Sequence, residues 1–183
     1  MPATHRLIAA LIAAAAWTGL GTQLAASIAL TGDPALAVWA MLRYFTVLTN
    51  LLVAVTFTAL AFGSRVVTPP RLAGVTIAIM LVGIVYHLLL RGMVELSGGA
   101  RLADTLNHSV TPVLVTLSWL FLAPKGHLSW RMPLAFAAYP LAYPFLDVAK
   151  LGWQPVLITA IGMALGFLVT GYMMTALDRH LAR

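Results

Sequence analysis

Thr46 and His108 are the two side chains of this sequence best suited to covalent chemistry. A threonine hydroxyl becomes a nucleophile when a base takes its proton, and the imidazole of histidine is the commonest base. A carboxylate that orients the imidazole would complete the set, and Asp104 or Asp147 could supply it. Such a set would attack the carbonyl carbon of an acyl ester.

Polar side chains recur at helical spacing around both residues. Arg43, Thr46 and Asn50 fall on one helix face, because residues three and four positions apart are neighbours on a helix. Three other apolar segments carry stripes of the same kind. These stripes are Asp104, Asn107, His108 and Thr111; Tyr139, Tyr143 and Asp147; and His87 with Arg91. At about 1.5 Å per residue all four stripes reach the outer half of a membrane, which predicts one shared site.

Several of these residues could assist the reaction. Arg43, Asn50 or Asn107 could stabilise an oxyanion, and Tyr143 could line the substrate pocket. Each has an ordinary interpretation as well. Arg43 could form a structural ion pair with an aspartate, and Tyr143 could belong to an aromatic belt at the membrane interface. Thr46 itself could bond back to the carbonyl four residues earlier, as helix threonines commonly do.

The residues that would orient His108 could have either a catalytic or a purely structural role. Asp104 stands one turn before His108 and could hold its ring, but it could equally cap a helix or pair with Arg101. Asp147 and His87 are further candidates for supporting the imidazole. His108 could instead be a packing histidine that is hydrogen-bonded inside the bundle.

Composition places these residues in a membrane protein. Hydrophobic residues make up 61% of the 183 residues and charged residues only 9%, whereas about 25% of the residues of a soluble domain are charged. The net charge of +6 comes from scattered Lys and Arg that never form a run, so no nucleic-acid partner is expected. The chain has no cysteine, which excludes disulfides and thiolate ligands. We expect no metal and no cofactor.

Apolar runs separated by Gly, Pro and charged residues predict six spanning helices, each of about 20 residues. We therefore expect an all-α fold in which residues 1–183 form a single domain, a bundle of six transmembrane helices. The expected spans are 7–30, 36–62, 72–94, 102–122, 132–148 and 154–177. The first could be a signal peptide, but we expect it to be retained. Pro140 and Pro144 predict a kink in the fifth.

The distribution of positive charge predicts the orientation. Of the 11 Lys and Arg, seven fall on the side of the two termini and three on the other side. Cytoplasmic connections are enriched in Lys and Arg, so both termini should be cytoplasmic, in a bacterial inner membrane. The remaining one, Arg43, falls inside the second expected span, where a charge costs at least about 2.5–3.5 kcal/mol.

Three short motifs resemble those of a known family. They are Arg43-Tyr44-Phe45-Thr46, Leu106-Asn107-His108 and Tyr143-Pro144-Phe145-Leu146-Asp147. In this order, and on the second, fourth and fifth spans, they resemble the androgen-induced protein family of six-span intramembrane threonine hydrolases and its bacterial relatives, the "Pr-six-Pr" membrane proteins. The resemblance implies a Thr46 nucleophile, a catalytic His108 and hydrolysis of lipid esters, since the animal members act on fatty acid esters of hydroxy fatty acids. One departure is Thr111, where the animal members commonly have another histidine.

Three alternatives use the same residues. The chain could be a non-catalytic lipid-binding or transport protein with the same polar cavity. It could be a b-type haem protein with His87 and His108 as axial ligands. It could also be a metal hydrolase built on these histidines and an aspartate, although the usual zinc motifs do not occur. The expected partner in the main interpretation is a membrane lipid or fatty acyl ester, with the oligomeric state left open.

Overall fold

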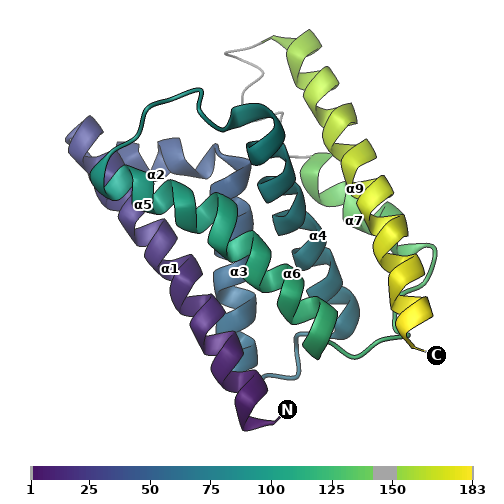
Figure 1. Cartoon of the computed structure of the whole chain (residues 1–183). Coiled ribbons are helices and arrows are strands. Elements are labelled where there is room, and N and C mark those ends of the chain that lie inside the picture. Colours follow the sequence, from purple (N-terminus) through teal and green to yellow (C-terminus); the bar gives the residue numbers. More distant parts are fainter. Residues whose placement is uncertain (1, 142–151, 183) are drawn as a thin grey trace.

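Helices form nearly all of the regular structure in the computed structural model, which describes residues 2–141 and 152–182. Within those ranges there is no strand, so the prediction of an all-α fold is confirmed. The helices pack side by side, and the N- and C-termini lie at the same end of the bundle (Figure 1).

The N-terminal part consists of a long helix and a bent pair. Helix α1 covers Ala3–Thr31, α2 covers Pro34–Leu42 and α3 covers Phe45–Ala61. The start of α2 follows from its sequence, because Asp33 Oδ1 accepts hydrogen bonds from the next two backbone N–H groups that the helix leaves unpaired. Pro34 at the first position needs no N–H partner.

The expected continuous span 36–62 is wrong, because α2 and α3 meet at an angle of 93°. The break falls at Arg43 and Tyr44, where Tyr44 has extended backbone geometry. A physical reason is the charge of Arg43. A straight helix would carry the guanidinium into the apolar bundle, whereas the break leaves Arg43 half-buried at the end of α3. No Gly or Pro marks this break in the sequence.

The middle of the chain contains two helical runs with π-helical turns. The first run is α4 (Pro69–Val85) followed by η1 (Tyr86–Leu90), so it ends before the expected limit of 94. The second run is α5 (Gly98–Thr105), η2 (Leu106–Val110) and α6 (Thr111–Leu122), which begins before the expected residue 102. The two π-helical turns carry five of the polar residues described below: Tyr86 and His87 in η1, and Asn107, His108 and Ser109 in η2.

The C-terminal part contains α7 (Met132–Leu141) and the long α9 (Trp153–Leu181). Pro140 lies inside α7. Pro144, the second proline of the expected kink, lies outside the described residues, as do Tyr143 and Asp147. Close packing joins α9 to α7 through Gly171, where a Cβ would lie 2.9 Å from Pro133.

Three of the described helices are long and apolar enough to cross a membrane: α1, the run of α4 with η1, and α9. A fourth crossing results if the bent pair α2 and α3 counts as one. The outer surface of these helices is strongly apolar. Ile158, Ile161, Leu165 and Val169, which follow one face of α9, are all exposed. Such a face suits lipid rather than water, because a soluble monomer rarely exposes a large apolar patch.

Candidate active site

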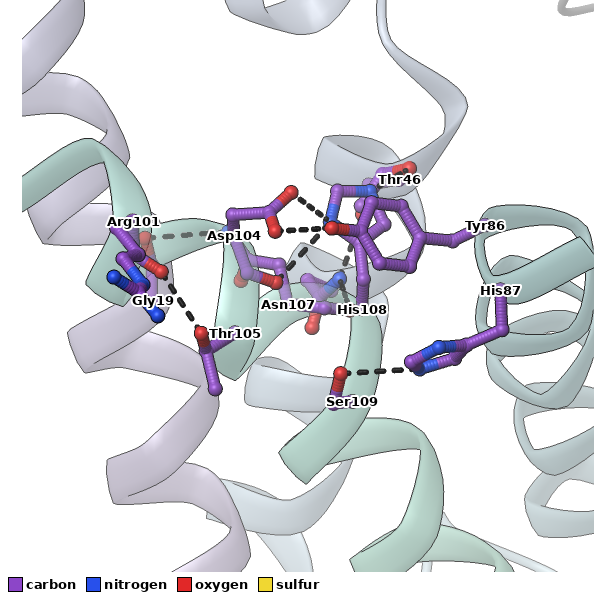
Figure 2. A network of polar contacts seen from close by, with 11 residues as sticks. Gly19, Thr46, Tyr86, His87, Arg101, Asp104, Thr105, Asn107, His108 and Ser109 are labelled. Carbon is purple, nitrogen blue, oxygen red and sulfur yellow. Dashed lines mark hydrogen bonds and ion pairs between the residues drawn. The ribbon is translucent and has the colours of Figure 1, made fainter. Parts of the chain in front are cut away.

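Thr46 and His108 lie in direct contact. Thr46 is the second residue of α3 and His108 is in the middle of η2, 62 positions later in the chain. Their atoms Oγ1 and Nε2 are 3.2 Å apart, which is hydrogen-bond distance (Figure 2). The sequence predicted that the two stripes would meet, and the structure brings these two members together.

The other ring nitrogen of His108 faces Asp104. Nδ1 lies 3.0 Å from the carboxylate atom Oδ1 of Asp104 and 3.2 Å from the backbone carbonyl oxygen of the same residue. Both side chains are 19% exposed. Asp104 does not cap a helix, because Ser97 holds the N-cap position of α5. Of its two sequence interpretations, the contact with His108 is therefore the one that the geometry favours.

These contacts determine which nitrogen carries the proton. A backbone carbonyl and a carboxylate can only accept, so Nδ1 of His108 must be the donor. In the neutral imidazole Nε2 is then the acceptor, and the hydroxyl of Thr46 donates to it. Catalysis by a nucleophile, a base and an orienting carboxylate requires this placement of protons, with Nδ1 protonated toward the carboxylate and Nε2 free to accept from the hydroxyl.

Tyr86 completes the surroundings of the imidazole. Its hydroxyl donates a hydrogen bond to Oδ2 of Asp104, the carboxylate oxygen that His108 leaves unused. Its ring stacks on the imidazole of His108, with 4.2 Å between centroids and 14° between planes. The carboxylate is thus held from two sides and the imidazole from one face (Figure 2).

A proline accounts for the local geometry of η2. Pro112 has no N–H and its ring would clash with the carbonyl of His108, so the regular bonding pattern cannot continue through this turn. The N–H of Thr111 instead reaches the carbonyl of Leu106, five residues earlier. Gly83 of α4 makes room for this turn, because a Cβ there would lie 3.0 Å from Pro112. Single π-helical turns of this kind occur frequently at functional sites.

The break between α2 and α3 has a chemical consequence for Thr46. Other helix threonines, such as Thr76 and Thr116, donate to the carbonyl four residues earlier. Thr46 stands in the first turn after the break, and its hydroxyl is directed to His108. The ordinary interpretation of Thr46 as a back-bonded helix threonine is therefore wrong.

Asn50 and Asn107 fix the relative position of three helices. The amide nitrogen of Asn50 donates to the carbonyls of Thr46, at 2.9 Å, and Asn107, at 3.1 Å. The amide nitrogen of Asn107 donates to the carbonyl of Gly19 in α1 at 3.3 Å. Both N–H groups of the Asn50 amide are occupied, and the Asn107 amide is directed to α1. These contacts hold η2 against α3 and α1. They leave Asn50 without a side-chain N–H for the oxyanion role expected from the sequence.

An apolar cavity of about 520 Å³ opens beside the reactive pair. Thr46 and His108 line it together with residues of α4, η1 and α9. The lining is otherwise mainly aliphatic and aromatic, and it includes Leu81, Val85 and Phe167. Ligand sites in proteins have volumes of roughly 300–1,000 Å³.

The remaining predicted residues lie at various distances from this pair. Nε2 of His87 contacts Oγ of Ser109 at 3.1 Å and lines a separate groove of about 580 Å³, which His108 also reaches. His87 packs edge-on against Tyr86, and its described contacts are with Tyr86 and Ser109 rather than with the imidazole of His108. Its expected orienting role is therefore not supported. Arg43 lies in the turn before α3, outside the helix face on which the sequence placed it.

The other polar members of the stripes have separate positions. The hydroxyl of Tyr139 lies 3.4 Å from that of Thr49, beside a different cavity of about 440 Å³. Thr111 is fully buried. Tyr143 and Asp147, predicted as a pocket residue and a second orienting carboxylate, lie outside the described residues.

Sequence reasoning missed Tyr86, Gly19 and Ser109. Tyr86 precedes His87, and a tyrosine within an apolar run was the available signal. Gly19 had no signal in the sequence. A Cβ at Gly19 would collide with Oδ1 of Asn107, so only glycine lets α1 approach η2 this closely.

The metal and haem alternatives depend on the surroundings of the histidines. Among residues 2–141 and 152–182 no group of three or more His, Asp or Glu is arranged to hold a metal ion. Both ring nitrogens of His108 contact protein groups. No family model, curated protein or solved structure matches the chain.

Proposed function

We propose that this protein is an intramembrane hydrolase of lipid acyl esters in which Thr46 is the nucleophile, His108 the general base and Asp104 the orienting carboxylate. The observation that carries the proposal is the pair of contacts made by one imidazole, Nε2 with Thr46 and Nδ1 with Asp104. The three groups stand in the chemical order of a hydrolase triad. That order, rather than any single residue, favours catalysis.

The reaction proceeds through an acyl-threonine. Oγ1 of Thr46 attacks the ester carbonyl carbon while Nε2 of His108 takes the hydroxyl proton, and a tetrahedral oxyanion forms. The bond to the alcohol oxygen then breaks, and the imidazolium gives its proton to that oxygen. A water molecule, deprotonated by the same Nε2, attacks the acyl-threonine. The fatty acid leaves and the Thr46 hydroxyl takes back a proton.

The oxyanion is stabilised by the start of α3. Thr46 is in the first turn, where backbone N–H groups have no carbonyl partner within the helix. The helix dipole adds partial positive charge at the same end. The N–H of Thr46 is a donor on the nucleophile itself, the arrangement used in serine hydrolases. Arg43, one turn earlier in the chain, adds positive charge near this end.

The substrate class follows from the cavity and its setting. A pocket lined by aliphatic and aromatic groups, with the reactive pair on its wall, suits the apolar chain of a lipid. The exposed apolar surface of α9 supports a position within a bilayer, from which lipid substrates can enter. The resemblance to threonine hydrolases of lipid esters at Arg43–Thr46 and at Leu106–His108 supports the same class.

We also propose that the chain crosses a bacterial inner membrane six times, with both termini in the cytoplasm. Three long apolar helices and the bent pair supply up to four crossings. The short apolar α7 and the helical run from α5 to α6 would supply the other two. The common position of both termini at one end of the bundle supports an even number of crossings (Figure 1). The distribution of Lys and Arg supports the orientation.

Ester hydrolysis by the purified protein in lipid vesicles tests the proposal. Thr46→Val and His108→Ala should each lower kcat/KM by roughly three orders of magnitude, and the double variant should be scarcely slower, because the two groups act as a unit. Thr46→Ser should retain part of the activity. Thr49→Val is the matched control in the same helix, since Thr49 faces Tyr139. An active Thr46→Val protein would refute the covalent mechanism, and an inactive parent that still binds lipid would identify a lipid-binding protein.

A further inference from the structure

One wall of the cavity beside Thr46 includes two glycines, which have no side chain to fill the space. This wall is a single face of α9, on which Thr159, Gly162, Met163 and Gly166 follow one another at helical spacing. The two glycines differ in their surroundings. A Cβ at Gly166 would lie 3.3 Å from Leu81, so this glycine serves the packing of α9 against α4.

At Gly162 a Cβ would meet no atom within 4 Å. The helix backbone therefore forms the cavity wall there, and close helix packing does not require a glycine at this position. Gly in a helix interior destabilises the helix relative to Ala. Glycine at position 162 therefore keeps this space open although it lowers the stability of the helix. The space is part of the cavity that reaches Thr46.

The reaction geometry determines which part of an ester occupies this space. The carbonyl carbon must lie at Oγ1 of Thr46, and the leaving oxygen must face Nε2 of His108, which protonates it. The alcohol part therefore leaves on the side of η2. The acyl part extends along α4 and α9, whose residues supply most of the apolar lining.

We infer that the acyl chain of the substrate lies along α9 and that Gly162 determines how long a chain the site accepts. The inference rests on the proposed function, because it takes Thr46 as the acylated residue. It makes Gly162 a specificity-determining position for long-chain fatty acyl esters.

Chain-length profiles of Gly162→Ala and Gly162→Leu test the inference. The substrates are 4-nitrophenyl butyrate, octanoate and palmitate, with one alcohol throughout. Gly162→Leu should lower the ratio of kcat/KM for palmitate to that for butyrate by about tenfold. The leucine would exclude about two methylene groups of the acyl chain from the apolar site, and losing their burial weakens binding by about that factor. Gly162→Ala should give an intermediate ratio.

Gly21→Leu is the matched control. Gly21 is likewise an exposed helix glycine whose Cβ would meet nothing within 4 Å, but it lines a different groove, with Trp17 and Leu24. This variant should keep the parent ratio. The same ratio in Gly162→Leu as in the parent would overturn the inference, and so would an equal fall of the ratio in Gly21→Leu.

Binding of free palmitate separates failure of this inference from failure of the proposed function. The parent should bind palmitate about tenfold more tightly than Gly162→Leu, whether or not it hydrolyses esters. Equal binding by both proteins would overturn the inference. Absence of hydrolysis in the parent, together with weaker palmitate binding in Gly162→Leu, would contradict the catalytic proposal alone and leave the chain-length role supported.

Discussion

Tyr86 and Asp104 are joined by a hydrogen bond from the phenol hydroxyl to the carboxylate, and this bond links η1 to α5, the helix that leads into the turn of the reactive histidine. Oδ1 of the same carboxylate holds Nδ1 of His108. Asp104 therefore receives one donor from η1 and one from the next turn of its own helical run. Its position, and through it the position of the imidazole, depends on Tyr86.

Tyr86→Phe should slow the reaction without abolishing it. The variant keeps the ring that stacks on His108 but loses the donor to Asp104. A hydrogen bond to a charged group contributes about 1.5–3 kcal/mol, so kcat should fall by roughly 10- to 100-fold. KM should change little, because Tyr86 is not among the residues that line the cavity beside Thr46. Steady-state kinetics check this prediction, and a change confined to KM would contradict it.

Asp104→Asn should be more damaging than Tyr86→Phe. The amide can donate to Nδ1 of His108, which would place the imidazole proton on Nε2 and remove the acceptor for Thr46. The expected loss in kcat is about four orders of magnitude, with the fold retained. Measuring both the kcat and the thermal unfolding temperature of the variant tests this prediction. A variant with near-parent kcat would show that Asp104 has only a structural role.

Gly19→Ala should destabilise the protein through Asn107. The added Cβ would collide with Oδ1 of Asn107 and push η2 away from α1. Overpacking of this kind costs about 1–3 kcal/mol. The control is Gly21→Ala, one half-turn further on, where the new methyl group meets nothing and should stabilise the helix by about 0.5–1 kcal/mol. Thermal unfolding in detergent distinguishes them, and equal midpoints would disprove the contact.

The orientation of the chain can be tested with reporter fusions. A fusion after Thr68 and one at the C-terminus should read cytoplasmic, and one within residues 91–97 should read external. The prediction follows from the seven-to-three distribution of Lys and Arg. A C-terminus outside the cell would exclude cytoplasmic termini, and if the fusion after Thr68 were still cytoplasmic it would also exclude an even number of crossings.

The sequence was informative where spacing alone determines position. Asp104 and His108 share a helix face because they are four residues apart, and the polar stripe of Thr46 was expected to face them. Chain breaks were not predictable in this way. The 93° bend falls at a point where the sequence has no Gly or Pro, and the charge of Arg43 was the one local sign of it.

Contacts between distant segments were also beyond the sequence. The close approach of Gly19 to Asn107 depends on how two helices cross, which no local pattern specifies. The partnership of Tyr86 with Asp104 joins residues 18 positions apart on two helical runs, each of which contains a π-helical turn. Of these turns only the second had a local signal, the proline at position 112.

Covalent labelling tests the central claim, the nucleophilic role of Thr46, most directly. The protein in lipid vesicles is treated with an alkyl fluorophosphonate, and the modified residue is located by mass spectrometry of its peptides. The account predicts one adduct on Thr46, lost in Thr46→Val and strongly slowed in His108→Ala, with Thr49→Val labelled like the parent. Labelling that persists in Thr46→Val, or a parent that hydrolyses lipid esters but is modified at another residue, would contradict it.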